Sequence, residues 1–137
     1  MISRLSHSTI YVLDQDKARD FYVNVLGFSV HTDMLMPNGF RWLSVHTKGH
    51  AENQIVLYGI ETADAEVKAH LKPLLEANKM GAGVFETDDI DGTFRDLKAK
   101  EVTFLKEPTH EFYAIEALFL DGCGNWFSLT EHRANGA

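Results

Sequence analysis

Apolar and polar residues alternate along residues 5–13 (LSHSTIYVL), the pattern of a strand that buries one of its two faces. His7 and Tyr11 fall on one face of this strand, opposite its aliphatic side chains. The spacing changes over residues 16–27, where apolar side chains recur at helical intervals and form one stripe. The beginning of the chain is therefore predicted to be a strand followed by an amphipathic helix.

Turn-forming residues set the limits of the next elements. Asp14 is placed to cap the start of the helix, and Gly27 is placed to end it. Three further strands are predicted at residues 28–34, 40–47 and 53–60, separated by polar, glycine-containing turns. This half of the chain is predicted to have the element order βαβββ.

The second half repeats this order at an offset of about 74 positions, although few residues are identical. A strand at 81–87 precedes a helix capped by Asp88 or Asp89, and strands follow at 102–107, 113–120 and 125–131. Residues 61–80 are charged and helix-prone, and Pro73 is expected to kink or restart that helix. We expect a single α+β domain over residues 1–137, with module one at about 1–60, a connecting segment at about 61–80 and module two at about 81–132.

Composition narrows the possible functions. The chain has 137 residues, a formal net charge of −7 and no basic stripe, which argues against nucleic acid as a partner. No apolar run reaches the roughly 20 residues needed to cross a bilayer, and the N-terminus lacks the apolar core of a signal peptide. Cys123 is the single cysteine and is expected to be an incidental surface residue. These features favour a cytoplasmic protein that does not bind membranes.

Three stretches resemble one known family: LSHSTIYVLDQDKARDFYVNVLGFSV, VFETDDIDGTFRDLKAKEV and EALFLDGCGNWFSL. They are similar to the vicinal oxygen chelate superfamily, which includes glyoxalase I, extradiol dioxygenases and the bleomycin- and fosfomycin-resistance proteins. The resemblance implies two βαβββ modules that form a curved, mostly antiparallel eight-stranded sheet around a cleft, with the helices outside. It also implies a homodimer, because many members of this size pair so that modules complete each other's clefts.

Metal-dependent members of this family hold one divalent ion with a His or Glu from each of four strands. The resemblance places these positions at His7, Val56, Ala82 and Ser128, so that one ligand of four is present. A shift by one residue turns a strand side chain to the opposite face and does not restore the site. One imidazole beside Val, Ala and Ser is a poor site for a divalent ion, and neither a metal nor another cofactor is expected.

Strand parity assigns a set of residues to the predicted cleft: His7, Tyr11, Tyr58, Glu86, Trp126 and Ser128. An aromatic pocket with a few polar groups is typical of a small-molecule site. Structural roles compete with this interpretation, because His7 can be a strand histidine bound to a neighbour, Trp126 a core aromatic and Glu86 a solvated strand end. Glu116 stands among apolar residues and needs a partner, and an ion pair with Arg41 is one hypothesis that would bring both residues to the ligand site.

Two main functions are compatible with these residues. The first is a metal-free protein of the glyoxalase/bleomycin-resistance type that binds a small organic molecule in an aromatic cleft. The alternative is a metal-dependent enzyme of the same family, a glyoxalase-like lyase or a dioxygenase, with a non-standard metal site. Metal-free catalysis, with His7 and either Glu86 or Glu116 as acid–base groups, is a third possibility, and a purely structural or interaction role is a fourth.

Overall fold

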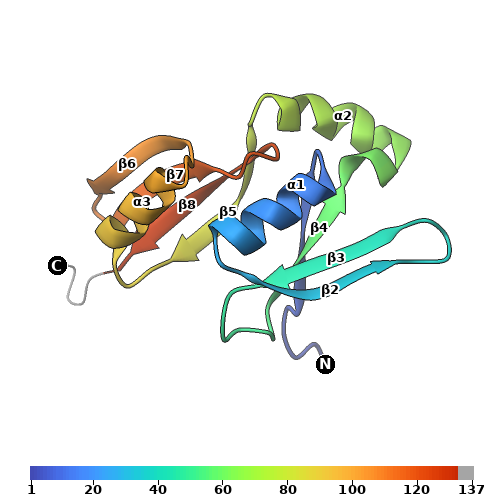
Figure 1. Ribbon diagram of the computed structural model, residues 1–137, viewed down its shortest axis with the longest axis horizontal. Helices are drawn as coiled ribbons and strands as arrows, with labels where there is room; N and C mark the ends of the chain where they lie inside the picture. The colour runs from blue at the N-terminus through green and yellow to red at the C-terminus, as the bar shows by residue number, and fades with distance from the viewer. Residues whose placement is uncertain (133–137) are drawn as a thin grey trace.

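Two four-stranded sheets, each with a helix against one face, form the architecture shown in Figure 1. The computed structural model describes residues 1–132. The first module contains β1 (His7–Val12), α1 (Gln15–Asp20), η1 (Phe21–Val25), β2 (Ser29–Leu35), β3 (Arg41–His46) and β4 (Gln54–Gly59). A short turn η2 (Ile60–Thr62) and α2 (Ala65–Glu76) lead to the second module, which contains β5 (Met80–Glu86), α3 (Ile90–Ala99), β6 (Phe104–His110), β7 (Ile115–Leu120) and β8 (Asn125–Glu131).

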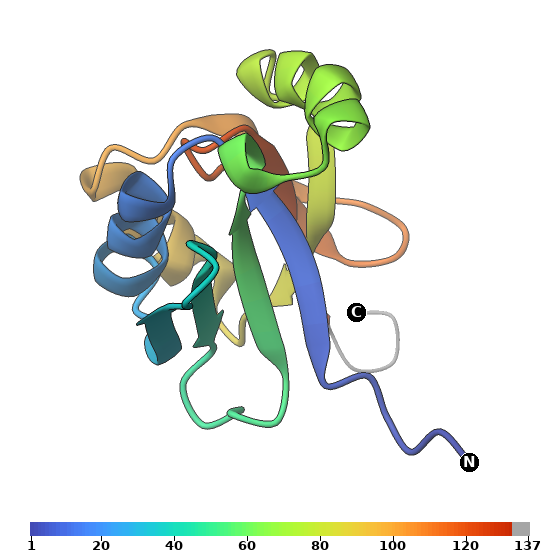
Figure 2. The ribbon, with the colours of Figure 1, turned by 90° about the vertical axis from the view of Figure 1, so that its right-hand side faces the viewer.

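The sheets have the same strand order in both modules. Sheet one runs β1-β4-β3-β2 and sheet two runs β5-β8-β7-β6. In each sheet the first pair is parallel and the other two pairs are antiparallel. The predicted α+β fold of two βαβββ modules is confirmed, with its eight strands hydrogen-bonded as two sheets of four. The first strand of each module lies at the edge of its sheet, as Figure 2 shows for β1 beside β4.

Local capping explains where the helices begin and end. The Asp14 side chain accepts hydrogen bonds from the backbone N–H groups of Asp16 and Lys17, so its predicted role is confirmed. Gly27 adopts a left-handed conformation, with φ of 78°, directly after the helical segment. Asp89 caps α3 through the N–H group of Gly92, which decides between the two predicted caps.

The connecting segment folds as one helix, α2, which lies at the top of the molecule in Figures 1 and 2. Pro73 lies inside this helix and does not restart it. The carbonyl that Pro73 leaves without its helical partner belongs to Ala69, an exposed residue, so that water can bind it. The fully buried Leu75 fixes the last turn of the helix against module two, where it lies beside Gly124. None of the helices within residues 1–132 combines the length and the apolar character needed to span a bilayer.

One hydrophobic core joins the helix-covered faces of both sheets. The apolar side of β1 and the fully buried Tyr22 of η1 belong to the same cluster as Phe119 and Phe127 of sheet two. The Tyr22 and Phe127 rings meet edge to face with centroids 6.2 Å apart. The two modules are therefore packed together through their helix sides, and the opposite faces of both sheets are left for other contacts.

Candidate functional site

We call the sheet face opposite the helices the outer face of each module. Register and burial place most of the predicted site residues on these two outer faces. The residues are His7, Tyr11 and Tyr58 on sheet one, and Glu86, Glu116, Trp126 and Ser128 on sheet two. The structure brings them together as two separate groups, one aromatic and one polar, on two different sheets.

The outer face of sheet one carries an aromatic cluster formed by Tyr11, Phe40, Trp42 and Tyr58. The centroid of the Tyr58 ring lies 5.1 Å from that of Tyr11 and 4.9 Å from that of Phe40. The ring centroids of Phe40 and Trp42 are 6.2 Å apart. A cavity of about 520 Å³ opens against Phe40, Trp42, Tyr58 and the neighbouring polar residues Asn38 and Thr62. This volume is in the range of small-molecule sites. Sequence reasoning missed Phe40 and Trp42, because apolar residues occupy both faces of their strand.

His7 lies at the exposed start of β1, beside this cluster. Its ring Nδ1 is 2.8 Å from the Ser6 hydroxyl oxygen, and the imidazole meets the Trp42 ring edge to face with centroids 6.2 Å apart. The hydrogen bond matches the structural role that the sequence allowed for His7. The Trp42 contact places the same ring at the rim of the aromatic cluster.

Arg41 lies on the helix side of sheet one and not on the outer face. Its guanidinium Nε is 2.8 Å from Asp33 Oδ1, and Nη1 is 2.7 Å from Asp16 Oδ1 at the start of α1. The hypothesised ion pair between Arg41 and Glu116 is wrong, because the structure pairs each of them with other residues. The hydrogen bond to Asp33 is the main reason why the pKa of Arg41 is raised, so this arginine is a fixed cation that braces α1 against sheet one.

Glu116 is the centre of a polar network on the outer face of sheet two, the Glu116 network. Its Oε1 accepts hydrogen bonds from Lys106 Nζ at 2.7 Å and from the Tyr113 hydroxyl at 2.5 Å. Its Oε2 accepts a hydrogen bond from the Ser128 hydroxyl at 2.5 Å. Lys106 also lies 3.3 Å from Glu111. The partner that the sequence required for Glu116 is therefore a lysine on the adjacent strand β6.

The three donors determine the protonation of Glu116. Burial acts to raise the pKa of this carboxyl, but the hydrogen bonds from Lys106, Ser128 and Tyr113 outweigh it and hold the pKa at about 2. The hydrogen bond to Glu116 in turn raises the pKa of the Tyr113 phenol. Glu116 is therefore ionised at neutral pH and too weak a base for proton abstraction near pH 7.

The Glu116 network gives a testable pH dependence. Because the pKa of Glu116 is lower in the folded protein than in the unfolded chain, its stabilising effect is complete above about pH 4.5 and is lost as the pH falls toward 2. Replacing Lys106 by methionine removes one donor and is expected to raise this pKa, which NMR titration of the Glu116 side-chain carbonyl measures. Lys48→Met is the control, since Lys48 lies in module one, and an unchanged pKa in Lys106→Met would contradict the assignment of Lys106 as a main partner.

The four positions that the family resemblance assigns to metal ligands do not form a metal site. Ser128 binds Glu116, and Val56 is a buried aliphatic residue. The expected place of Ala82 in the cleft is wrong, because a register shift between Gly81 and Gly83 turns Ala82 toward the core. None of the residues on this part of β5 before Glu86 carries a metal-binding group. Within residues 1–132, no group of three or more His, Cys, Asp or Glu is placed to hold an ion.

Trp126 and Glu86 occupy opposite ends of the outer face of sheet two. The Trp126 ring lies on Gly81, where a Cβ atom would come within 2.6 Å of the indole. The Glu86 carboxylate is exposed and lies 3.6 Å from His132 Nε2, as expected for a solvated strand end. Trp126 therefore supplies an apolar wall, whereas Glu86 lies at the end of β5 in contact with solvent.

Cys123 is buried, so the expected surface location is wrong. Burial, followed by the nearby Asp121 charge, raises the pKa of its thiol to about 12. The turn that carries Cys123 is covered by α2 and joined to β1 through the hydrogen bond from Leu13 N–H to the Cys123 carbonyl. A thiol in this position is an unreactive core side chain.

Comparison with known proteins agrees with the fold and with the arrangement of the strands. The family model for the Glyoxalase/Bleomycin resistance protein/Dioxygenase superfamily matches residues 4–129. YetH from Bacillus subtilis strain 168 is 33% identical over 133 residues, which cover 96% of this chain and 100% of that protein. The crystal structure of UcmS2 is 41% identical with a TM-score of 0.88, and the match covers 95% of this chain and 98% of that one. TnmS3, an antibiotic binding protein from Streptomyces sp. CB03234, is 28% identical with a TM-score of 0.78, over 96% of this chain and 98% of that one.

The matched residues include both βαβββ modules and the strands that carry the aromatic cluster and the Glu116 network. The chain belongs to the glyoxalase/bleomycin resistance protein/dioxygenase superfamily.

Proposed function

We propose that this protein binds a small organic molecule at the aromatic cluster without using a metal ion. The cluster with its cavity of about 520 Å³ is the observation that carries this proposal. Aromatic walls bury large apolar area at low entropic cost, and the nearby Asn38, Thr62 and His7 supply groups that orient a ligand. Similarity to TnmS3, an antibiotic binding protein, supports binding as the activity.

The chemistry of the outer faces supports a metal-free site. Val56 and Ser128 stand where metal-dependent relatives place ligands, and the carboxylate nearest to Ser128 belongs to Glu116, which is already neutralised by Lys106. A divalent ion would have to displace this ammonium group and would find few further donors. The Glu116 network is better suited to hydrogen-bonding a polar group of an organic ligand.

The binding proposal predicts that Trp42 is required for affinity. A thermal-shift screen with a library of metabolites and antibiotics is expected to find a compound that raises the melting temperature of the wild-type protein. Trp42→Ala is expected to weaken binding of that compound at least tenfold, in line with the roughly 1.5–3 kcal/mol that burying a large apolar side chain contributes. Isothermal titration calorimetry measures the effect, and Phe112→Ala, which removes a fully exposed aromatic ring from the loop between β6 and β7, is the control.

Two results would overturn this proposal. One is a stoichiometric transition metal in protein purified without chelator, measured by inductively coupled plasma mass spectrometry. The other is a hit whose affinity is the same in Trp42→Ala and in the wild-type protein. Circular dichroism of each variant confirms that it is folded.

We also propose that the protein is a homodimer in which a second copy closes each outer face. The outer faces lie on separate sheets, and each forms only one wall of a cleft. Apolar side chains remain exposed there, with Met34 at 56%, Trp42 at 36% and Val84 at 63% of their full accessible surface. Light scattering coupled to size exclusion is expected to give twice the mass of one chain, and Val84→Lys is expected to shift the protein toward the monomer. A monomer at micromolar concentration in the wild-type protein would contradict this arrangement.

A further inference from the structure

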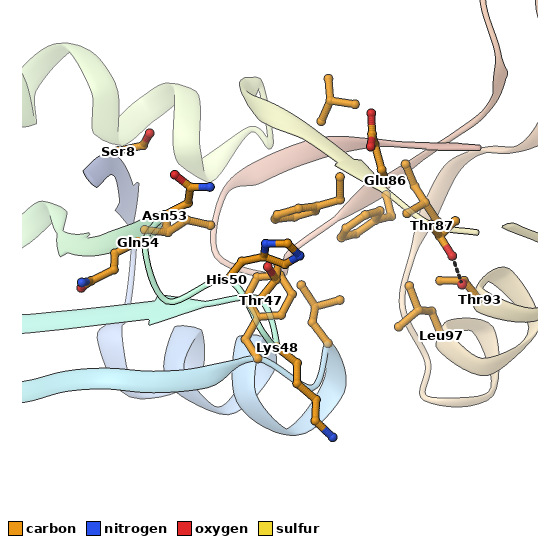
Figure 3. A pocket seen from close by; sticks show the side chains of 17 residues that line it. Ser8, Thr47, Lys48, His50, Asn53, Gln54, Glu86, Thr87, Thr93 and Leu97 are labelled. Atoms are coloured by element: carbon orange, nitrogen blue, oxygen red, sulfur yellow. Dashed lines mark hydrogen bonds between the residues drawn. The ribbon is translucent and has the colours of Figure 1, made fainter. Parts of the chain in front are cut away.

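A second cavity, of about 750 Å³, lies between the two modules on their helix side. We call it the intermodule cavity. It is lined by the loop between β3 and β4, by the end of β5 and by the first turns of α3, as Figure 3 shows. Its lining shares no residue with the aromatic cluster or the Glu116 network, although Gln54, Val84 and Glu86, at the ends and edges of the outer faces, reach its rim.

The floor of the intermodule cavity is apolar. Phe28 and Phe85 meet edge to face there with ring centroids 5.3 Å apart, and both rings are only partly buried. Beneath them lie Leu97, Phe119 and Leu129, which belong to the common core. The cavity therefore opens the core between the modules to solvent and leaves aromatic surface uncovered, which is unfavourable at about 25 cal/mol per Å² of exposed apolar area.

The rim of the intermodule cavity is polar, with Lys48 on the side of module one and Glu86 on the side of module two. Thr47, Lys48 and His50 line this side, in the loop after β3. On the opposite side the Thr87 and Thr93 hydroxyl oxygens lie 2.8 Å apart and share one hydrogen bond.

The charged side chains of the rim differ in whether a neighbouring residue already pairs with them. His50 lies 3.2 Å from Glu52, and Glu86 lies 3.6 Å from His132. Lys48 forms no ion pair with any residue in the described range 1–132, which leaves its charge for a ligand. The rim therefore offers the Lys48 ammonium group beside an apolar floor, on the side of the cavity opposite to Glu86.

We propose that the intermodule cavity is a second binding site, specific for an amphipathic organic anion. The apolar body of the ligand lies against Phe28 and Phe85 and covers their exposed rings. Its anionic group lies at the module-one rim, next to Lys48. Because such a ligand contacts both modules at once, its binding also stabilises their packing against each other.

Two dyes with the same ring system test this proposal. 8-Anilinonaphthalene-1-sulfonate carries an anionic group, and N-phenyl-1-naphthylamine is its uncharged counterpart. Fluorescence titration of the wild-type protein is expected to show saturable binding of both dyes at one site per chain, with the sulfonate bound more tightly. Lys48→Glu is expected to weaken sulfonate binding about fivefold at low ionic strength and to change binding of the uncharged dye less than twofold.

The location is tested by adding the same side chain to either face of β1. Ser8 lines the intermodule cavity, whereas its neighbour Thr9 points to the outer face. Ser8→Trp is expected to fill the cavity and reduce binding of both dyes at least tenfold, while Thr9→Trp leaves both unchanged. Thermal unfolding verifies that both variants are folded. If Ser8→Trp does not fold, Lys48→Glu, a surface substitution, still tests the proposal.

These results are separable from the function proposed for the aromatic cluster. Loss of dye binding in Trp42→Ala with retention in Ser8→Trp would assign the dyes to the outer face and overturn the second site. Equal affinities of Lys48→Glu and wild type for the sulfonate dye would overturn the role of Lys48 and with it the specificity for anions. Neither result bears on the ligand found in the metabolite and antibiotic screen.

Discussion

Asp121→Ala is expected to lower the free energy of unfolding by about 4 kcal/mol, in the range found when one partner of a buried charged network is removed. Asp121 is fully buried in the turn before β8. Its Oδ1 accepts the backbone N–H groups of Cys123 at 2.7 Å and Asn125 at 3.0 Å. Its Oδ2 accepts the Tyr22 hydroxyl at 2.6 Å and Asn125 Nδ2 at 3.0 Å. Alanine leaves all four donors without this acceptor in the core.

The effect is expected to be large because the same residues connect the two modules. Tyr22 belongs to η1 in module one, and Asn125 Nδ2 also donates to the Tyr11 carbonyl of β1 at 2.9 Å. Burial, reinforced by the Asp121 charge, raises the pKa of Tyr22, so that its hydroxyl is protonated and donates at neutral pH. The carboxylate is therefore an anchor for both modules and for the turn that starts β8.

Tyr22→Phe is the graded control for this prediction. It removes one of the four donors and is expected to cost about 1.5–3 kcal/mol, the usual contribution of a hydrogen bond to a charged group. Urea unfolding followed by circular dichroism measures both variants. If Asp121→Ala costs no more than Tyr22→Phe, the hydrogen bonds from Cys123 and Asn125 to Asp121 do not contribute to the stability of the fold.

The strands and helices that depend on the spacing of nearby apolar residues could be predicted from the sequence. The alternation in residues 5–13 corresponds to β1 (His7–Val12) and the helical stripe in 16–27 to α1 and η1, and Asp14 and Gly27 act as predicted. These features depend on residues within one turn or one strand, so that the sequence contains their whole cause. The repeated order of elements then indicated two modules of one fold.

Features that depend on distant residues were not predictable in the same way. The β-bulge between Gly81 and Gly83 reverses the orientation of Ala82, and strict alternation cannot reveal an inserted residue. Arg41 turns to the helix side because Asp33 and Asp16 lie there, one on the neighbouring strand and one on a helix. The burial of a charged or reactive group depends on what covers it, and that is decided by packing between modules.

For Glu116 the sequence predicted that a partner is needed, but not which residue it is. A carboxylate among apolar strand residues requires a partner, and the structure supplies Lys106, Tyr113 and Ser128. The sequence does not identify Lys106, because two register shifts in the β6–β7 pair change which residues lie side by side. The need for a partner was correct, and its identity required the register.

Gly124→Ala is the second substitution with a large expected effect, a loss of about 3 kcal/mol or more in the free energy of unfolding. Gly124 has φ of 108°, a conformation that strains any other residue. A Cβ atom at this position would also lie 2.6 Å from Leu75 Cβ and 2.8 Å from Leu75 Cα. Because Leu75 is fully buried, α2 must move away from the turn to admit the methyl group.

Gly122→Ala separates strain from collision within the same turn. Gly122 has φ of 73°, but a Cβ atom there would meet nothing within 4 Å, so its loss is expected to be about 1 kcal/mol from the backbone alone. The difference between the two variants in urea unfolding then measures the packing of α2 on module two. Equal losses would mean that α2 yields freely, and the connecting helix would be a loosely attached linker. A larger loss for Gly124→Ala shows that α2 is held against the turn and helps to fix Asp121 and its partners where the two modules meet.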